Sequence, residues 1–199
     1  MVNLDLAGGA LLDLGVYSLT WVFQALYHTQ PEEIKEKPNV VASINQYHTG
    51  ADESTAVVLS FPKHRSQGIA TSSMRVAHNP DQRGTAGPAI RIQGTKGEIQ
   101  VVGPGFKPLA YRVILKSKPG EVEVVDCPIE GHSGMGWEAD ECAKCLRDGK
   151  KESTTLPHSE SIAIMEVMEE ALRQGGVKYP ELITTDVYDA KSPLNTGTN

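Results

Sequence analysis

The first helix of the chain begins in the stretch Ala7-Gly8-Gly9-Ala10-Leu11-Leu12-Asp13-Leu14-Gly15-Val16-Tyr17. The helical pattern runs from about Gly9 to Tyr27, and apolar residues cover most of the circumference of this helix. A helix that is apolar on most sides has to be buried on most sides. The sequence therefore predicts a domain built around a buried first helix.

Beyond this helix, the pattern from Val40 to Ile129 changes to the alternation that is typical of strands. The candidate strands are residues 40–48, 54–61, 67–76, 88–93, 97–102, 109–116 and 121–127. Two helices follow, Trp137 to Arg147 and Ser159 to Gln174, and each ends at a turn that contains glycine. This order predicts an α+β fold with a single open antiparallel or mixed β-sheet and the helices on one face.

The open face of this sheet is not expected to be fully exposed to water. Apolar residues fall on both sides of strand 54–61, with Val57 on one side and Val58 on the other, and strand 109–116 is mixed in the same way. A mixed face of this kind is typical of an interface. We therefore expect a two-fold homodimer through the open face, formed by one domain of residues 1–183, followed by a disordered tail at 184–199.

Length and composition fit a globular domain. A chain of 199 residues can bury roughly 70% of its unfolded surface. The net charge of −6 leaves no basic face for nucleic acid. The longest apolar stretch, near residues 11–26, is interrupted by polar side chains, and no basic region precedes it. We therefore expect no membrane span, no secretory signal and a cytoplasmic location.

The cysteines and histidines do not have the spacing of a metal site. Cys142 and Cys145 form a CxxC pair, but the chain has only one other cysteine and no second pair. The pair also lies inside a helical pattern. We expect two reduced, partly buried thiols and no metal.

The sharpest chemical signal is a carboxyl group and a phenol, Asp13 and Tyr17, four residues apart on one face of the first helix. Gly8 and Gly9 allow another backbone or a flat ligand to approach, and Gly15 removes a side chain between the two polar residues, which could leave room for a substrate. Alternatively, Asp13 favours the positive end of the helix dipole, and Tyr17 is a half-buried aromatic residue with an ordinary hydrogen bond. The spacing alone leaves both interpretations open.

The segment from Ala7 to Tyr17 resembles the opening of the C-terminal domain in the Gfo/Idh/MocA family of oxidoreductases. Three further segments agree in order and distance: Gly84-Thr85-Ala86-Gly87-Pro88 leading to 90–99, Trp137-Glu138-Ala139-Asp140-Glu141 leading to 145–149, and Ser161-Ile162 leading to 165–168. The resemblance covers about residues 4–182. It is strongest to the branch of dimeric dihydrodiol dehydrogenases and NADP-dependent D-xylose 1-dehydrogenases, in its fungal form. This branch has a tyrosine where the usual family motif has histidine, and Tyr17 stands at that position.

The resemblance implies that Tyr17 is the general acid/base that moves the substrate hydroxyl proton as hydride passes to or from the nicotinamide. It implies that Asp13 hydrogen-bonds and orients the substrate. A free phenol has a pKa of about 10, so it needs a nearby cation to act as a base at neutral pH. In the family this cation is a lysine in a Glu-Lys-Pro motif of the Rossmann domain. Phe106 is a candidate substrate contact, although an aromatic residue after a Gly/Pro turn is also a common loop anchor.

The sequence Glu36-Lys37-Pro38 is not expected to be that motif, because it follows the first helix in a polar run with no Rossmann sheet before it. NADP would bind mainly to an N-terminal Rossmann domain that is absent here, so we expect a fragment, an engineered chain or a truncated gene product. The resemblance implies the substrate-binding half of an NADP-dependent dehydrogenase for a D-xylose-like pyranose or a trans-dihydrodiol, inactive by itself. The alternatives are a non-catalytic dimerisation module and a stand-alone lipid or sugar carrier.

Overall fold

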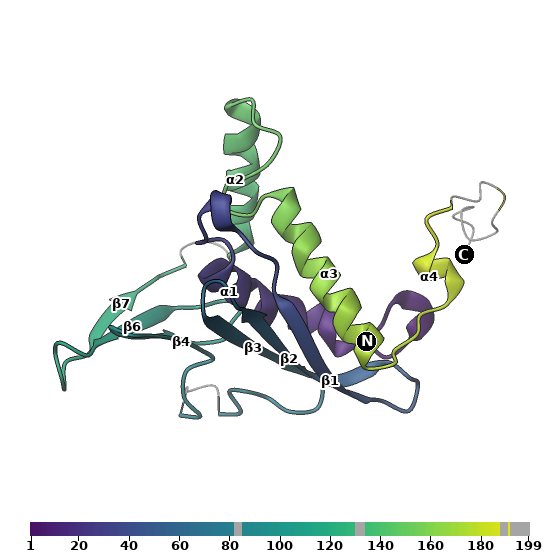
Figure 1. The fold of residues 1–199 in the computed structure, drawn as a ribbon, viewed down its shortest axis with the longest axis horizontal. Helices are drawn as coiled ribbons and strands as arrows, with labels where there is room; N and C mark the ends of the chain where they lie inside the picture. Colours follow the sequence, from purple (N-terminus) through teal and green to yellow (C-terminus); the bar gives the residue numbers. More distant parts are fainter. Residues whose placement is uncertain (82–84, 130–133, 188–190, 192–199) are drawn as a thin grey trace.

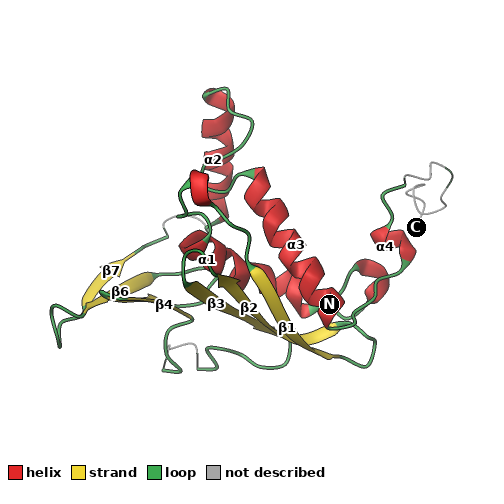
Figure 2. Ribbon diagram, in the orientation of Figure 1, coloured by secondary structure: helices red, strands yellow, loops and turns green. Residues whose placement is uncertain are grey.

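The computed structural model describes residues 1–81, 85–129, 134–187 and 191. Its helical segments are η1 (Leu4–Leu6), η2 (Leu11–Gly15), α1 (Val16–Leu26), η3 (Glu32–Ile34), α2 (Met135–Arg147), α3 (His158–Gln174) and α4 (Glu181–Thr184). Its strands are β1 (Asn39–Gln46), β2 (Asp52–Phe61), β3 (Ser66–Ser73), β4 (Ile90–Gly94), β5 (Gly97–Val102), β6 (Ala110–Leu115) and β7 (Glu123–Asp126). Figures 1 and 2 show α1 and α3 on one side of the strands, with α2 extending away from them. Every strand and long helix predicted from the sequence is present.

The strands form two antiparallel sheets, which corrects the expectation of a single sheet. One sheet has the order β1-β2-β3 and the other the order β4-β5-β6-β7. The α+β class and the antiparallel pairing are confirmed. At β3, the hydroxyl of Ser18 in α1 donates a hydrogen bond of 2.8 Å to the carbonyl of Thr71, so the helix is tied to this strand.

The hydrophobic core lies between the three-stranded sheet and helices α1 and α3. Val57, Leu59 and Phe61 of β2 are at most 1% exposed, and they share one cluster with Leu19 and Phe23 of α1. The contribution of α3 to this cluster is Ala163, Ile164, Val167, Met168, Ala171 and Leu172. The alternation expected for residues 54–61 is therefore confirmed. The expectation that the first helix is buried on most sides is wrong, because α1 buries only the side that carries Leu19 and Phe23.

A buried polar cluster joins α1 to the start of α3. The carboxyl group of Glu160 is 1% exposed and accepts a hydrogen bond of 2.8 Å from the side-chain amide of Gln24. Its second oxygen lies 2.9 Å from Nδ1 of His28. Because a buried carboxyl group is costly unless it is hydrogen-bonded, these contacts fix α1 relative to α3.

The cysteine pair lies on α2, where Cys142 is exposed and Cys145 is buried. Burial, reinforced by Glu141, raises the pKa of the Cys145 thiol. The expectation of partly buried thiols is therefore correct for Cys145 and wrong for Cys142. Among the residues described, no three His, Cys, Asp or Glu side chains gather closely enough to hold a metal ion. The expectation of no metal site stays a prediction.

The expected tail begins where α4 ends, at Thr184. Residues 188–190 and 192–199 of this tail lie outside the described residues, as does Gly84 of the second family-like segment. The prediction of a disordered tail is therefore not tested.

Candidate functional site

Tyr17 and Phe106 come together at the first turn of α1. Their ring centroids are 6.0 Å apart, with an angle of 57° between the planes. The two side chains are 49% and 64% exposed, so both present a face to solvent. The loop that carries Phe106 is tied to the helix by Trp21, whose indole N–H donates a hydrogen bond of 2.8 Å to the carbonyl of Gly105. Two of the three site residues expected from the sequence are therefore neighbours.

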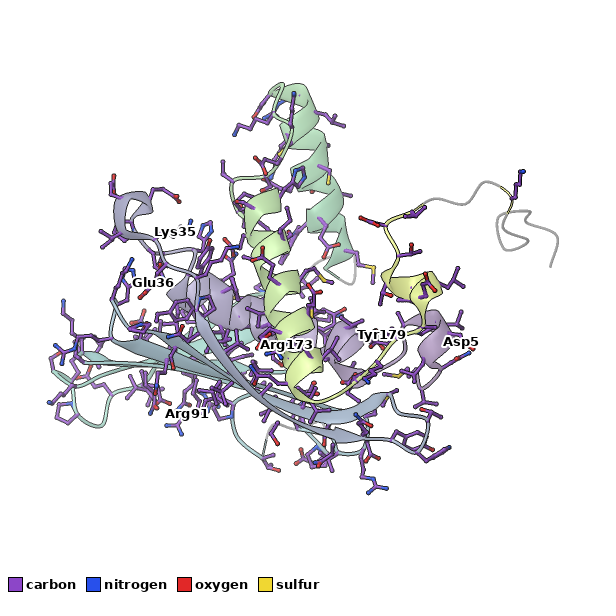
Figure 3. All side chains as sticks on the ribbon, turned by 45° about the vertical axis from the view of Figure 1, so that its right-hand side comes forward. Asp5, Lys35, Glu36, Arg91, Arg173 and Tyr179 are labelled. Atoms are coloured by element: carbon purple, nitrogen blue, oxygen red, sulfur yellow. The ribbon has the colours of Figure 1, made fainter. Side chains whose placement is uncertain are left out.

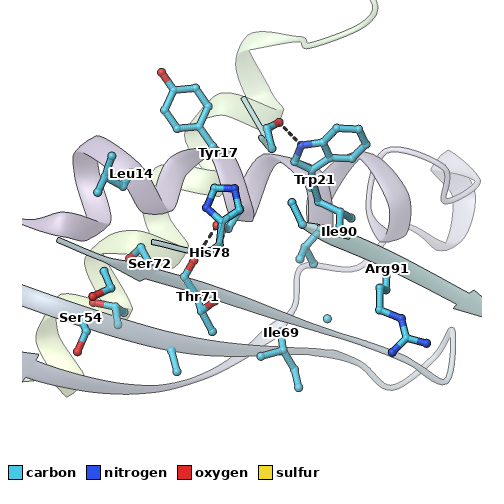
Figure 4. A pocket seen from close by; sticks show the side chains of 18 of the residues that line it. Leu14, Tyr17, Trp21, Ser54, Ile69, Thr71, Ser72, His78, Ile90 and Arg91 are labelled. Carbon is cyan, nitrogen blue, oxygen red and sulfur yellow. Dashed lines mark hydrogen bonds between the residues drawn. The ribbon is translucent and has the colours of Figure 1, made fainter. Parts of the chain in front are cut away.

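These residues stand at one end of an open cleft of about 1050 Å³. One side of the cleft is a stripe of helical residues, and the strands β1 to β4 provide most of the remaining lining (Figure 4). The helical residues of the stripe are Leu14, Tyr17, Ser18, Trp21, Val22, Ala25 and Leu26. Such a volume suffices for a small-molecule ligand.

Asp13 occupies a different position from Tyr17. It is exposed and belongs to η2, a turn of π-helix that leads directly into α1. Leu14 of the same turn lines the cleft, whereas Asp13 is not among the cleft residues. A π-turn is frequent at functional sites, and it places a side chain differently from an α-helical turn. The role expected for Asp13 therefore stays a prediction.

The glycines of the first segment serve close packing. A Cβ atom on Gly15 would lie 2.6 Å from the Leu11 side chain and 3.1 Å from the hydroxyl of Ser72 in β3. The absence of a side chain at Gly15 therefore lets the helix approach the sheet, and it does not make room for a substrate. A Cβ on Gly8 would lie 2.6 Å from the carbonyl oxygens of Met1 and Asn3, so the backbone approach expected at this glycine is confirmed.

The sequence Glu36-Lys37-Pro38 lies in a connection between η3 and β1, as expected. The ammonium of Lys37 pairs with Glu166 of α3, and the carboxyl of Glu36 accepts a hydrogen bond of 3.2 Å from the backbone N–H of His64. In Figure 3, Glu36 and Lys35 lie at the opposite end of the molecule from Tyr179. These residues hold the connection in place and do not line the cleft.

Most cleft residues, among them Trp21, His78 and Arg91, were not identified from the sequence. Trp21 follows Tyr17 by one helical turn, so the same spacing rule could have found it. His78 and Arg91 lie on the loop after β3 and on β4, and nothing in their local sequence indicates that they share a cleft with Tyr17. Figure 4 shows Arg91 and Ile69 projecting away from α1, on the opposite side of the strands.

Comparison with known proteins shows a close relative. D-xylose 1-dehydrogenase (NADP(+)) from Hypocrea jecorina is 66% identical over 204 residues, a match that covers 99% of this chain and 51% of that enzyme. Trans-1,2-dihydrobenzene-1,2-diol dehydrogenase from Homo sapiens is 33% identical, and the match covers 88% of this chain and 48% of that enzyme. Both matches fit the resemblance to the Gfo/Idh/MocA family that the sequence motifs indicated. The chain spans about half the length of the curated relatives that it matches.

Two solved structures share the fold of this chain. The yvaA protein of Bacillus subtilis superposes with a TM-score of 0.53 at 16% identity, and the match covers 87% of this chain and 50% of that protein. A protein from Bacteroides fragilis NCTC 9343 gives a TM-score of 0.52 at 15% identity, with 85% and 52% covered. No protein-family model matches the sequence.

One segment, Leu4–Leu26, is long and apolar enough to cross a membrane by length and composition alone. The core helix of a globular protein meets the same test, and Leu11, Leu19 and Phe23 of this segment belong to the hydrophobic core. The segment is therefore weak evidence for a membrane span, and the expectation that the chain has none stays a prediction.

Proposed function

We propose that this chain is the substrate-binding part of an NADP-dependent oxidoreductase that acts on a D-xylose-like pyranose or a trans-dihydrodiol. The observation that carries the proposal is the 66% identity to an NADP-dependent D-xylose 1-dehydrogenase along 99% of the chain. The exposed Tyr17 at the end of an open cleft supports it.

Each site residue has a role in this proposal. Tyr17 moves the proton of the substrate hydroxyl, since its phenol is exposed at the mouth of the cleft. Asp13 hydrogen-bonds the substrate and orients it. Phe106 offers a ring face beside Tyr17, against which the apolar side of a sugar or diol ring can pack.

The cation that a phenol needs to act as a base comes, in this proposal, from the other half of the protein. Two arginines line the cleft, but Arg75 lies 3.0 Å from the carboxyl of Glu53 and Arg91 lies 2.7 Å from that of Glu98. Both guanidinium groups are therefore engaged within this chain.

The cofactor also belongs to that half. A dinucleotide site is built from parallel strands joined by helices, with the phosphates at a glycine-rich turn before a helix. The described strands pair only in antiparallel fashion, so the residues of this chain do not fit NADP. Half-exposed Leu109 and Trp137, together with Tyr17, leave apolar surface that the cofactor half can cover.

The isolated chain is therefore expected to bind NADP only weakly, with a Kd above about 1 mM, because most dinucleotide contacts come from the parallel βαβ unit. Titration calorimetry of the 199-residue chain tests this. The comparison is a chimera in which the chain is joined to the half of the Hypocrea jecorina enzyme that it does not match. Micromolar affinity of the isolated chain for NADP would contradict the assignment of the cofactor site to the other half.

The alternative is a non-catalytic module that only dimerises or competes with complete subunits for partners. The coverage of 51% of the Hypocrea jecorina enzyme favours it for the isolated polypeptide. The presence of Tyr17 beside Phe106 favours descent from an active enzyme. A chimera that binds NADP but turns over neither D-xylose nor a trans-dihydrodiol would support the alternative.

We also propose that the chain forms a two-fold homodimer through the face of the sheets that the helices leave open. Val41, Val58 and Ile69 form a row across β1, β2 and β3 on this face. Val41 and Ile69 are 65% and 70% exposed. Arg91 forms a two-pronged pair with Glu98 on the same face of the second sheet, and this pair lowers the pKa of Glu98 to about 2. An apolar row beside a satisfied ion pair is typical of an interface.

Ile69→Lys should convert this dimer to a monomer, because it places a charge at the centre of an interface that buries more than about 1,200 Å². Light scattering at micromolar concentration measures the mass. Leu146→Lys is the matched control, since Leu146 is 80% exposed on α2, away from the sheets. A monomeric wild-type chain, or an Ile69→Lys dimer, would contradict the proposed interface.

The location that we propose for this function is the cytoplasm. A net charge of −6 offers nucleic acid no electrostatic attraction. The partners that we propose are therefore a small sugar or diol, the cofactor half and a second copy of the chain.

A further inference from the structure

A buried carboxyl group lies at the N-terminal end of the helix that carries the site. Asp52, the first residue of β2, is 0% exposed. Its Oδ2 accepts a hydrogen bond of 2.6 Å from the backbone N–H of Leu11 and one of 3.2 Å from the hydroxyl of Thr55. The first N–H groups of a helix have no partner within the helix, and an acidic group there also interacts favourably with the helix dipole. Asp52 therefore caps this helix from another element.

The second oxygen of the same carboxyl explains one of the two glycines before the helix. A Cβ atom on Gly9 would lie 1.9 Å from Oδ1 of Asp52. Gly9 also has φ +149°, a conformation that residues with a side chain rarely adopt. The chain thus reaches this carboxyl with bare backbone, and no larger residue can replace Gly9 while Asp52 stays in place.

A third contact comes from the far end of the chain. The hydroxyl of Tyr179 donates a hydrogen bond of 3.1 Å to the carbonyl of Gly8, and Figure 3 places Tyr179 beside the N-terminal segment that carries Asp5. Burial, reinforced by the charge of Asp52, raises the pKa of Tyr179 to about 12. The phenol therefore keeps its proton at neutral pH and remains a donor to Gly8.

The burial of the Asp52 carboxyl lowers the stability of the fold. Within the described part of the chain, Oδ1 of Asp52 is buried without a hydrogen-bond partner. An unsatisfied buried polar atom destabilises a fold, and apolar packing would serve stability alone equally well. Leu11, which Asp52 holds, is also the residue whose carbonyl accepts the N–H of Val16 across the π-turn. The cap therefore acts directly on the turn that precedes Tyr17.

We propose that Asp52 is a positioning residue, which fixes the rotation of the π-turn and thereby the directions of Asp13 and Tyr17. The proposal rests on the proposed function, because it needs Tyr17 to act on a substrate. Loss of the cap frees the π-turn to relax to α-helix. An α-helix turns by about 100° per residue and a π-turn by less, so this relaxation would change the angle between the directions of Asp13 and Tyr17.

The first arm of the test uses the chain without any reaction. In Asp52→Ala, the amide of Leu11 should exchange its hydrogen at least about tenfold faster than in the wild type, while amides in the middle of β2 stay within about twofold. Nuclear magnetic resonance measures both. An unchanged Leu11 amide would overturn the cap. If Asp52→Ala does not fold, Asp52→Asn replaces it in this experiment. The exchange rate of the Leu11 amide should then rise at least about threefold, because an amide oxygen is a weaker acceptor than a charged one.

The second arm uses the chimera. Asp52→Ala should lower kcat at least about tenfold and also raise KM, because both Tyr17 and Asp13 lose their directions, and Asp52→Asn, which keeps an acceptor for Leu11, should recover most of both losses. Gly9→Ala should lower kcat as well, and the double variant should be no worse than Gly9→Ala alone, since both changes break the same contact. Gly149→Ala is the control for backbone strain, with φ +67° and nothing within 4 Å, and should keep kcat within about twofold.

The two arms separate the proposals. An active wild-type chimera whose kcat is unchanged by Asp52→Ala overturns the positioning role and leaves the proposed function standing. The positioning role is also overturned if the decreases in kcat from Asp52→Ala and Gly9→Ala multiply in the double variant. A wild-type chimera without activity on a sugar or a diol overturns the proposed function, and with it the reason to position Tyr17.

Discussion

Tyr17→Phe in the chimera should lower kcat at least about a hundredfold and leave KM within about threefold, as expected when a general acid/base is lost. The variant keeps the ring that stands 6.0 Å from Phe106, so the shape of the cleft mouth is retained. Only the hydroxyl that moves the proton is removed. Steady-state kinetics with D-xylose over a range of pH provide the measurement.

The control for this variant is Asp13→Asn, which keeps the size of the side chain and removes its charge. Because Asp13 orients the substrate in our account, its loss should be milder in kcat and should fall more heavily on KM. Near-normal turnover in Tyr17→Phe would exclude the phenol from the reaction.

Phe23→Ala and Phe106→Ala are the same chemical change, but only Phe23→Ala should strongly lower the stability of the fold, because Phe23 lies in the core and Phe106 at the site. Phe23 is 0% exposed in the core, so its truncation should lower the free energy of unfolding by about 3–5 kcal/mol. Phe106 is 64% exposed, and its truncation should change that free energy by less than about 0.5 kcal/mol. Urea unfolding of the isolated chain measures both changes.

In the chimera, Phe106→Ala should instead raise KM at least about threefold, because a substrate ring loses an aromatic contact of roughly 1 kcal/mol. Equal stability losses for the two variants would contradict the assignment of Phe23 to the core and of Phe106 to the site.

The periodicity of the sequence was sufficient to predict the elements of the fold. Strand 54–61 alternates with a period of two, and the glycine pair after Gln174 ends α3, so both elements were predictable from local chemistry. The division into two sheets was not, because strand order is set by contacts between segments that lie far apart in the sequence. Local patterns carry no information on which group occupies a strand edge.

The site was predictable only in part. Spacing placed Asp13 and Tyr17 on one helix but left their role open, and the resemblance to a family added the roles. The contact between Tyr17 and Phe106 is tertiary and could not be derived from spacing. Asp52 lies just before the predicted strand 54–61 and had no assigned role, and the one signal of its role was the pair of glycines that make room for other groups.

The central claim is that this chain supplies the substrate side of a dehydrogenase whose cofactor side lies in another half. The most direct test is the initial rate of NADPH formation by the chimera with D-xylose and with a trans-dihydrodiol, measured beside the isolated chain. We expect NADPH formation by the chimera on at least one of the two substrates and none by the isolated chain. A chimera that binds NADP but oxidises neither substrate, or an isolated chain that forms NADPH, would contradict the account.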